Sequence, residues 1–194
     1  MKGFSILLYK ISRGWVTLVV LVGFLLFTAL VLPAQSAQST EGAEEVGSPD
    51  TSFFYSPADL YRMAEAYGPT GRAAYIRARF TFDLVWPIVY LVFLTITISW
   101  VYGKAFPPDS RWRLANLVPV AGMLFDYLEN GATSLVMARY PAQTAVVDVL
   151  APIFTLVKWL LVGGSFVVLL AGLVVGVWRW ARRWRGAEED RPTG

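Results

Sequence analysis

Four long apolar runs constrain this chain more than any other feature of its sequence. Each run is long enough to cross a bilayer core of roughly 30 Å as a helix, which takes about 20 residues. The runs cover residues 15–32, 80–102, 114–137 and 147–178. Backbone polar groups in lipid must find partners within the protein, which favours helices over open strands. The predicted fold is therefore all-α, a four-helix transmembrane bundle.

The composition agrees with a membrane protein. Of the 194 residues, 56% are hydrophobic and 16% are charged, whereas a soluble domain averages about 25% charged residues. The sequence contains no cysteine and no histidine. This excludes disulfides, thiolate catalysis, iron–sulfur clusters, histidine-ligated haem and most zinc or copper sites. We expect no metal and no cofactor, and acid–base chemistry would have to use Asp, Glu, Lys, Tyr or Arg.

The positions of Lys and Arg predict the orientation. Basic residues precede the first run, lie between the second and third, and follow the fourth. In a four-span chain these segments share one side, which the positive-inside rule makes cytoplasmic. We predict a multi-pass membrane protein with both termini in the cytoplasm. Segments 1–14, 103–113 and 179–194 would be cytoplasmic, and segments 33–79 and 138–146 would lie outside.

The first apolar run allows a second interpretation. Lys10 and Arg13 precede it and Ala34-Gln35-Ser36 follows it, a pattern that resembles a cleavable signal peptide. The run is longer than the apolar part of a usual signal peptide, which favours an uncleaved anchor. Cleavage would leave three spans and an N-terminus outside, and the sequence leaves both alternatives open.

The outer segment divides into two parts. Residues 33–52 are rich in small and polar side chains and predict a flexible linker. Ser56 and Pro57 then form a helix start, with a capping residue followed by proline at the first helical position. An apolar face at helical spacing follows, made of Leu60, Met63, Ala64 and Tyr67. We predict a short extracytoplasmic amphipathic helix, on the membrane surface or over the bundle mouth.

Three arginines follow this helix, at a place that the positive-inside rule does not explain. Gly68-Pro69 is expected to end the short helix, and Thr70 to start another that runs unbroken into the second span. Just outside that span lie Arg72, Arg77 and Arg79. Their forked donors would suit a lipid headgroup or another anion. The alternative is snorkelling at the interface with pairing to acidic neighbours such as Asp59 or Glu65.

The third apolar run carries polar residues at steps of three and four, so they share one helix face. They are Pro119, Gly122, Asp126, Glu129, Asn130 and Thr133. A charge in hydrocarbon is unfavourable, so such residues normally face the protein interior or a wet cavity. At about 1.5 Å per residue, Lys158 in the fourth run reaches the depth of Asp126. This depth predicts an ion pair between Lys158 and Asp126.

Asp83 and Tyr90 share a face of the second run and are expected to meet this stripe. We predict a polar cavity that opens to the outer leaflet. Its ligand-binding residues would be Asp83, Tyr90, Asp126, Glu129, Asn130 and Lys158. Three carboxylates beside one lysine do not all ionise easily, so Asp83, Asp126 and Glu129 are also the catalytic candidates. The alternative is that these side chains only hold the helices together.

Several short motifs resemble those of a recurring family of uncharacterised bacterial four-span membrane proteins. They are Phe54-Tyr55-Ser56-Pro57, Tyr67-Gly68-x-x-Gly71-Arg72-x-x-Tyr75, Asp83-x-x-x-Pro87-x-x-Tyr90, Phe125-Asp126-x-x-Glu129-Asn130, and Tyr140-Pro141 with Lys158. The resemblance implies a four-span fold in the bacterial inner membrane. It implies no function, because the family has no established activity. The sterol-isomerase and sigma-2-receptor group is similar in architecture alone, and such likeness does not carry function.

Three hypotheses for function follow. The first is a membrane protein whose polar cavity binds a lipid or lipid-like small molecule. The second is an intramembrane acid–base enzyme that acts on a lipid, as an isomerase does. The third is an accessory or assembly subunit without a ligand of its own. A proton-coupled carrier is a weaker option because the chain shows no internal repeat. We expect membrane lipids and no nucleic acid as partners, and Gly172-x-x-x-Gly176 allows a homodimer.

Overall fold

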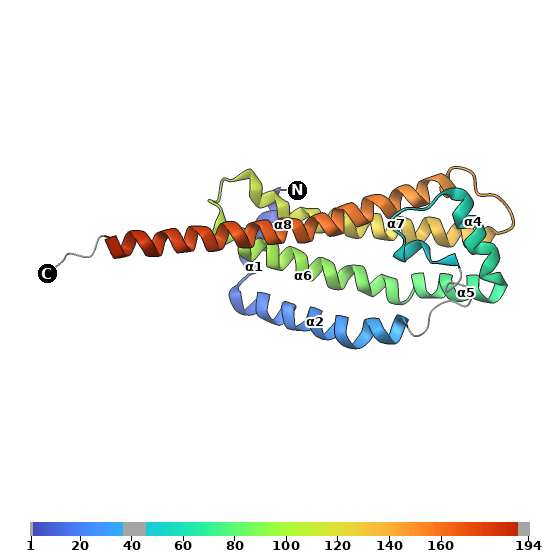
Figure 1. The fold of residues 1–194 in the computed structure, drawn as a ribbon, viewed down its shortest axis with the longest axis horizontal. Helices are drawn as coiled ribbons and strands as arrows, with labels where there is room; N and C mark the ends of the chain where they lie inside the picture. The colour runs from blue at the N-terminus through green and yellow to red at the C-terminus, as the bar shows by residue number, and fades with distance from the viewer. Residues whose placement is uncertain (1, 37–45, 190–194) are drawn as a thin grey trace.

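The computed structural model describes residues 2–36 and 46–189, which form helices and turns without a strand. Figure 1 shows the elements along the chain. They are α1 (Lys2–Ile11), α2 (Gly14–Ser36), η1 (Pro49–Thr51), α4 (Pro57–Ala66), α5 (Gly68–Arg79), α6 (Phe82–Ala105), η2 (Arg111–Leu117), α7 (Val118–Arg139) and α8 (Val147–Glu189). The prediction of an all-α protein is confirmed for this part of the chain.

The long helices pack along one another. α7 lies against α8 for much of its length, α6 contacts both, and α2 packs on α6 (Figure 1). In the described residues, three helical stretches are long and apolar enough to cross a membrane: Gly14–Pro33, Gly68–Ala105 and Val147–Arg182. The second of them consists of α5 and α6 with a short turn between them. These stretches indicate a membrane protein. The third predicted run, α7, is not among them, because its polar and charged residues lower its hydropathy.

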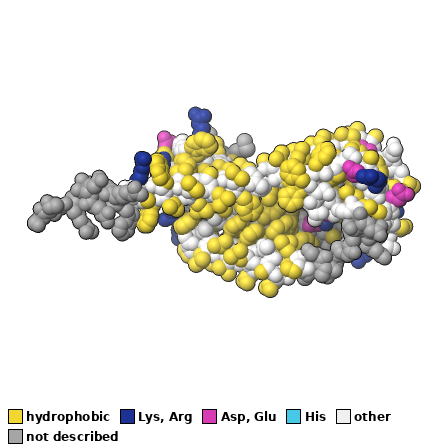
Figure 2. Space-filling view, in the orientation of Figure 1, with side chains coloured by type: hydrophobic (Ala, Val, Ile, Leu, Met, Phe, Trp, Pro, Cys, Tyr) yellow, Lys and Arg dark blue, Asp and Glu magenta, His cyan; other side chains and the backbone are white. Residues whose placement is uncertain are grey.

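The surface agrees with this assignment. On the face drawn in Figure 2, hydrophobic side chains cover most of the middle of the molecule, and most charged side chains lie towards its two ends. Large apolar side chains such as Leu30, Val167 and Val174 are more than 60% exposed. In water so many exposed apolar groups would favour association, whereas in lipid they are in their preferred solvent.

Stacked rings attach α2 to α6. Phe24 lies on Phe93 with ring centroids 4.1 Å apart and an interplanar angle of 9°. Phe27 stacks on Trp86 with centroids 5.8 Å apart. Such ring pairs add direction to a contact between two apolar helices. α2 is therefore held at a defined rotation about its axis and does not lie loosely on the surface.

The predicted continuous helix into the second span is wrong. One helix begins at Gly68, earlier than Thr70, and the chain breaks at Phe80 and Thr81 before α6 begins. At the break the Thr81 hydroxyl donates to the carbonyl of Arg77 over 2.8 Å, while its amide bonds to Ala78. The side chain thus takes the carbonyl that a continuing helix would use, a known competition between threonine and the helix backbone.

The predicted short helix with an apolar face is confirmed as α4, and its extracytoplasmic location stays a prediction. The Ser56 hydroxyl accepts from the amide of Asp59, and the Asp59 carboxylate accepts from the amide of Ser56, which completes a capping box. All four residues of the predicted apolar face are buried: Leu60, Met63, Ala64 and Tyr67. They pack with residues of α7 and α8, including Val136 and Ala151. The sequence allowed α4 to lie on the membrane surface or over the mouth of the bundle. These contacts place it over the ends of α7 and α8.

The linker prediction is wrong for its last part. Residues 46–52 form a turn with the short helix η1, and Pro49 within it is buried. The Tyr67 hydroxyl donates to the carbonyl of Gly47 over 2.7 Å. Small polar residues with Gly and Pro suggested flexibility, but contacts with α4 and α5 hold this segment in place. The first residues of the predicted linker, 33–36, belong to the helix α2, and residues 37–45 lie outside the described residues.

At the opposite end, α1 is fastened by polar contacts that the sequence did not reveal. The Ser5 hydroxyl donates to Asn116 over 2.8 Å, and Asn116 donates to Ser99 over 2.9 Å. The Arg113 guanidinium lies 4.2 Å from the ring centre of Tyr9, whose hydroxyl donates to the Arg113 carbonyl. Burial raises the pKa of Tyr9 to about 12. These contacts join α1 to α6 and η2.

Gly172 is needed for close packing within the chain. A Cβ atom at this position would lie 2.8 Å from Cδ2 of the buried Tyr102. Gly172→Ala is therefore expected to destabilise the fold by about 1 to 3 kcal/mol, the usual effect of overpacking. Gly163→Ala is the matched control in the same helix, because nothing lies within 4 Å of its added Cβ. Thermal unfolding in detergent measures both, and equal midpoints would contradict the prediction.

The proposed homodimer through Gly172 and Gly176 stays a prediction. Gly172 is buried against α6 of its own chain, so its small size already has a use there. No atom lies within 4 Å of a Cβ built on Gly176. Of the two glycines, Gly176 is the one that leaves open space beside α8.

Candidate functional site

The six predicted cavity residues all lie in the interior of the molecule. They come from α6, α7 and α8, and each side chain is buried: Asp83, Tyr90, Asp126, Glu129, Asn130 and Lys158. Asp126 contacts Tyr90 and Asn130, and Glu129 contacts Lys158, whereas Asp83 pairs with Arg79. Glu129 has no exposed surface at all. The polar stripe of α7 therefore faces inward, away from the apolar surface. That these residues bind a ligand stays a prediction.

The predicted partner of Lys158 is wrong. Its ammonium group forms an ion pair with Oε2 of Glu129, and the side chains of both residues are almost fully buried. Asp126 lies three residues before Glu129 on the same face, and a rise of about 1.5 Å per residue does not separate two positions so close in depth. The offset of α8 along the axis of α7 determines which carboxylate pairs with Lys158. This offset could not be predicted from the sequence.

A chain of hydrogen bonds leads from Glu129 towards the end of the molecule that carries α4. The Thr155 hydroxyl donates to Oε1 of Glu129 over 2.8 Å. The hydroxyls of Tyr55 and Thr155 are 2.9 Å apart. Because Thr155 has one proton and gives it to Glu129, Tyr55 must be the donor of that contact. Burial raises the pKa of Tyr55, so its hydroxyl keeps its proton at neutral pH. Sequence reasoning did not find this role of Tyr55.

Asp126 is held by neutral groups. The Tyr90 hydroxyl donates to its Oδ2 over 2.9 Å, and the Asn130 amide reaches its Oδ1 over 3.4 Å. About one turn after Asn130 along α7, the Thr133 hydroxyl accepts a hydrogen bond from the Tyr75 hydroxyl over 3.2 Å. The stripe on α7 is thus covered by tyrosines from α5 and α6, and Lys158 of α8 completes the group.

A second charged group lies at the start of α6. The Arg79 guanidinium pairs with Asp83, with Nε and Oδ2 2.9 Å apart, and also with Asp50 of η1. It lies 4.6 Å from the ring centre of Tyr75. Sequence reasoning missed Asp50 because it falls in the predicted linker. The Ser48-Pro49 pair before it was a signal for a helix start, but it did not identify Arg79 as the partner.

The three arginines differ in their surroundings. Arg79 is bound by two carboxylates, and Arg72 donates to the Ala64 carbonyl over 2.8 Å and covers the ring of Tyr140. The Arg77 side chain is exposed. The predicted alternative of pairing with Asp59 does not occur for these residues, since Asp59 pairs with Arg62. Headgroup binding stays a prediction, and Arg77 is the residue best placed for it.

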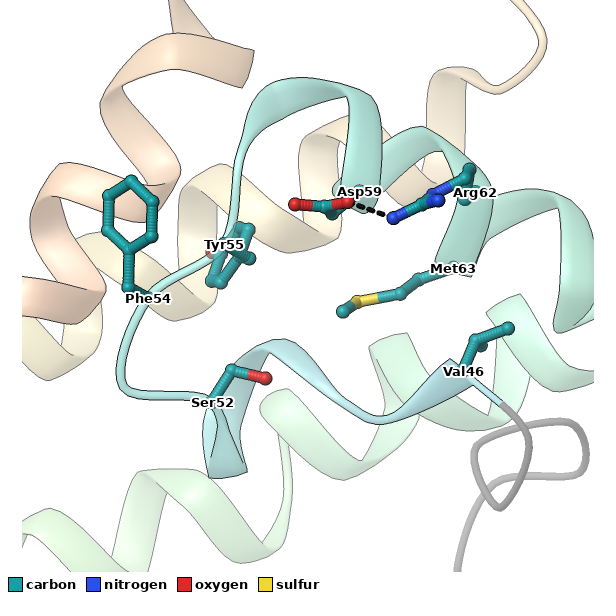
Figure 3. A pocket seen from close by; sticks show the side chains of 7 residues that line it. All are labelled: Val46, Ser52, Phe54, Tyr55, Asp59, Arg62 and Met63. Atoms are coloured by element: carbon teal, nitrogen blue, oxygen red, sulfur yellow. Dashed lines mark hydrogen bonds and ion pairs between the residues drawn. The ribbon is translucent and has the colours of Figure 1, made fainter.

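A pocket of about 390 Å³ lies at the end of the molecule that carries α4 (Figure 3). Since the sequence predicts that this end faces outward, we call it the outer pocket. Its wall consists of Val46, Ser52, Phe54, Tyr55, Asp59, Arg62 and Met63. Figure 3 shows the Asp59–Arg62 ion pair on one side and the rings of Phe54 and Tyr55 on the other. Hydrogen bonds from the backbone and side chain of Ser56 lower the pKa of Asp59, so this carboxylate is charged at neutral pH. Tyr55 belongs both to the wall and to the chain that ends at Glu129.

The chemistry open to the site follows from these contacts. Among the described residues, no group of three or more His, Cys, Asp or Glu side chains is placed to hold a metal ion. Neither Asp126 nor Glu129 belongs to the wall of the outer pocket. The pocket offers apolar contact, one ion pair and the edge of a hydrogen-bond chain. This set of groups suits binding of an amphipathic molecule.

Comparison with known proteins adds no assignment to this geometry. The resemblance to the bacterial four-span family, and the architectural likeness to the sterol-isomerase group, stay predictions on the motifs that suggested them. No family model, curated protein or solved structure matches the chain.

Proposed function

We propose that this chain is a four-span protein of the bacterial inner membrane, with both termini cytoplasmic, that binds a lipid or lipid-like small molecule at its outer end. Three helical stretches of membrane length support the topology, and α7 packs along both α6 and α8 as a fourth span would. The stacked rings between α2 and α6 favour an uncleaved α2. Arg113 and Arg179 lie at the end opposite to α4, as the positive-inside rule requires.

One observation carries the binding proposal. Tyr55 lines the outer pocket and also donates the first hydrogen bond of the chain that leads through Thr155 to the Glu129–Lys158 pair. A molecule that contacts the Tyr55 ring is therefore connected to the buried charges. The pocket volume of about 390 Å³ lies within the range of about 300 to 1,000 Å³ that is usual for small-molecule sites.

The wall favours an amphipathic ligand of the outer leaflet. Val46, Phe54 and Met63 provide apolar contact, and the Asp59–Arg62 pair provides both signs of charge at the rim. A zwitterionic or hydroxyl-bearing headgroup would meet both partners of that pair. The exposed Phe54 ring, 69% of whose surface is accessible, would close over the bound molecule.

Native mass spectrometry of the gently solubilised protein tests this proposal. The wild-type protein is expected to carry a co-purifying molecule, and Phe54→Ala is expected to reduce its occupancy about tenfold because an aromatic contact is lost. Phe53→Ala is the matched control, since this neighbouring ring is 58% exposed and does not line the pocket. An equal loss in both variants, or none in Phe54→Ala, would rule out the pocket as the binding site.

A second candidate is an accessory or assembly subunit without a ligand. The observation in its favour is that the buried carboxylates have partners within the chain: Asp83 has Arg79, Asp126 has Tyr90 and Glu129 has Lys158. A network satisfied in this way needs no ligand to complete it. This candidate predicts that the protein is purified without a bound small molecule but with another membrane protein.

The enzyme hypothesis requires a substrate path to Asp126 or Glu129, which the outer pocket does not provide.

A further inference from the structure

A second cavity lies at the other end of the molecule. It has a volume of about 510 Å³ and is found where α6 ends and α8 continues past the other helices (Figure 1). The residues around it are Trp100, Val101, Lys104, Leu173, Gly176, Val177, Arg179 and Trp180. We call this cavity the basic groove. None of the hypotheses for the outer pocket involves it.

The charges of the basic groove have one sign. Lys104 and Arg179 carry the positive charges, and no acidic residue is among the described residues that line it. Arg179 is held in position because its Nη1 donates to the carbonyl of Ala105 over 2.5 Å. A guanidinium has five N–H donors, so this bond leaves others for an anion. The Lys104 ammonium lies 5.1 Å from the ring centre of Trp100.

The rest of the wall is apolar and continues towards the middle of the membrane-length stretches. Val101, Leu173 and Val177 form it, and Leu173 and Val177 are 40% and 63% exposed. Trp100 and Trp180 lie at the charged end of the groove, where amphipathic rings normally mark the headgroup level. The groove therefore changes from cationic to apolar along its length, as a phospholipid changes from headgroup to acyl chain.

We propose that the basic groove binds one anionic phospholipid. The phosphate lies between Lys104 and Arg179, and an acyl chain runs along Val101, Leu173 and Val177. Charge complementarity selects a lipid with net negative charge, because each basic side chain near a membrane surface attracts such lipids. This inference requires only that the chain lies in a membrane and is independent of the outer pocket.

Two of the glycines in α8, Gly172 and Gly176, explain why the groove is open here. At Gly172 the side chain of Tyr102 fills the space beside the helix, whereas a Cβ on Gly176 would meet no atom within 4 Å. A larger residue at position 176 would enter the groove without disturbing the packing of α6 on α8. Gly176→Leu is therefore a variant that blocks the lipid while leaving both basic residues in place.

Native mass spectrometry with the full-length protein tests the proposal. The purified protein is titrated with phosphatidylglycerol, with phosphatidylcholine of the same acyl chains, and with inorganic phosphate alone. We expect preferential binding of phosphatidylglycerol and no binding of phosphate. Lys104→Gln with Arg179→Gln is expected to weaken phosphatidylglycerol binding about 25-fold, or about fivefold for each basic side chain removed. Gly176→Leu should weaken it at least as much as Lys104→Gln alone.

Matched controls separate the groove from general charge effects. Lys10→Gln with Arg111→Gln removes two exposed basic side chains of the same end that do not line the groove. Gly163→Leu adds the same side chain to α8 elsewhere. The affinity of both controls for the lipid should lie within about twofold of the wild-type affinity. This change is smaller than the effect expected from removing one basic side chain of the groove. Equal losses in controls and groove variants, equal binding of the two lipids, or binding of phosphate alone would each overturn the proposal.

Folding is checked separately for each variant. Arg179→Gln also removes the bond to the Ala105 carbonyl, so the double variant can lose stability. Lys104→Gln alone has no such bond to lose, and it should still weaken phosphatidylglycerol binding about fivefold. If Lys104→Gln and Gly176→Leu both fold and both bind phosphatidylglycerol as the wild-type protein does, the groove is not the site. The outer-pocket variant Phe54→Ala is expected to leave this binding unchanged, so the two proposals fail independently.

Discussion

Lys158→Met is expected to lower the free energy of unfolding by about 3 to 5 kcal/mol, the usual effect of removing one partner of a buried ion pair. The variant leaves the Glu129 carboxylate without its cation at a position with no exposed surface. Methionine has a similar length and fills the same space, so the loss reports charge and not volume. Equilibrium unfolding of the detergent-solubilised protein by a denaturant measures the change.

The double variant Glu129→Met with Lys158→Met provides the control. Replacing both partners of a buried pair by apolar residues is often neutral or stabilising, so most of the lost stability should return. Thr155 retains an acceptor in the carbonyl of Ala151, 3.1 Å away. A double variant no more stable than Lys158→Met would show that Glu129 is not the partner that matters.

A second double-mutant cycle, between positions 126 and 158, distinguishes the contribution of Asp126 from that of Glu129. In Asp126→Asn the new carbonyl oxygen still accepts from Tyr90, whose hydroxyl now bonds to Oδ2. The coupling energy between positions 126 and 158 should therefore be small beside that between 129 and 158, which lies in the range of about 0.5 to 3 kcal/mol for interacting residues. A larger coupling to position 126 would restore the pair first predicted from depth.

The second large effect is expected at Arg79. Arg79→Met should reduce the free energy of unfolding by about 2 to 3 kcal/mol, because it leaves two carboxylates without their shared cation. Asp83 and Asp50 both pair with this guanidinium, and all three side chains are less than 20% exposed. The same denaturant titration measures the loss. η1 should also become more accessible to proteases, since Asp50 loses its attachment.

Two variants serve as controls for Arg79. Arg79→Lys keeps the charge but not the planar fork that reaches two carboxylates, so it should recover only part of the stability. Arg77→Gln removes an exposed arginine from the same helix and should change the stability by less than about 0.5 kcal/mol. If Arg77→Gln proves as harmful as Arg79→Met, the ion pairs with Asp50 and Asp83 are not the cause.

Several elements could be predicted because local spacing specifies them. Ser56-Pro57 marks the start of α4, and the apolar residues that follow at helical spacing are buried as expected. The polar stripe of α7 faces the interior for the same reason, since residues three and four apart share a face. These predictions concern one helix at a time and need no knowledge of its neighbours.

The contacts between elements could not be predicted in the same way. Asp50 lies in a polar stretch that suggested a linker, yet it pairs with Arg79 at the end of the molecule that carries α4. Tyr55 lines a pocket and donates to Thr155 of α8. Each contact depends on where two helices end relative to each other, and hydrophobic periodicity does not encode that position.

The amino-acid sequence by itself determined the helical class, the membrane-length apolar stretches and the inward direction of the charged face of α7, because burial and helical spacing are properties of single segments. Only the tertiary structure decided that Lys158 meets Glu129 and not Asp126. The positions of these two carboxylates along the axis of α7 differ by less than one helical turn of about 5.4 Å. The choice between them depends on the rotation and offset of α8 against α7, which the packing of whole helices sets.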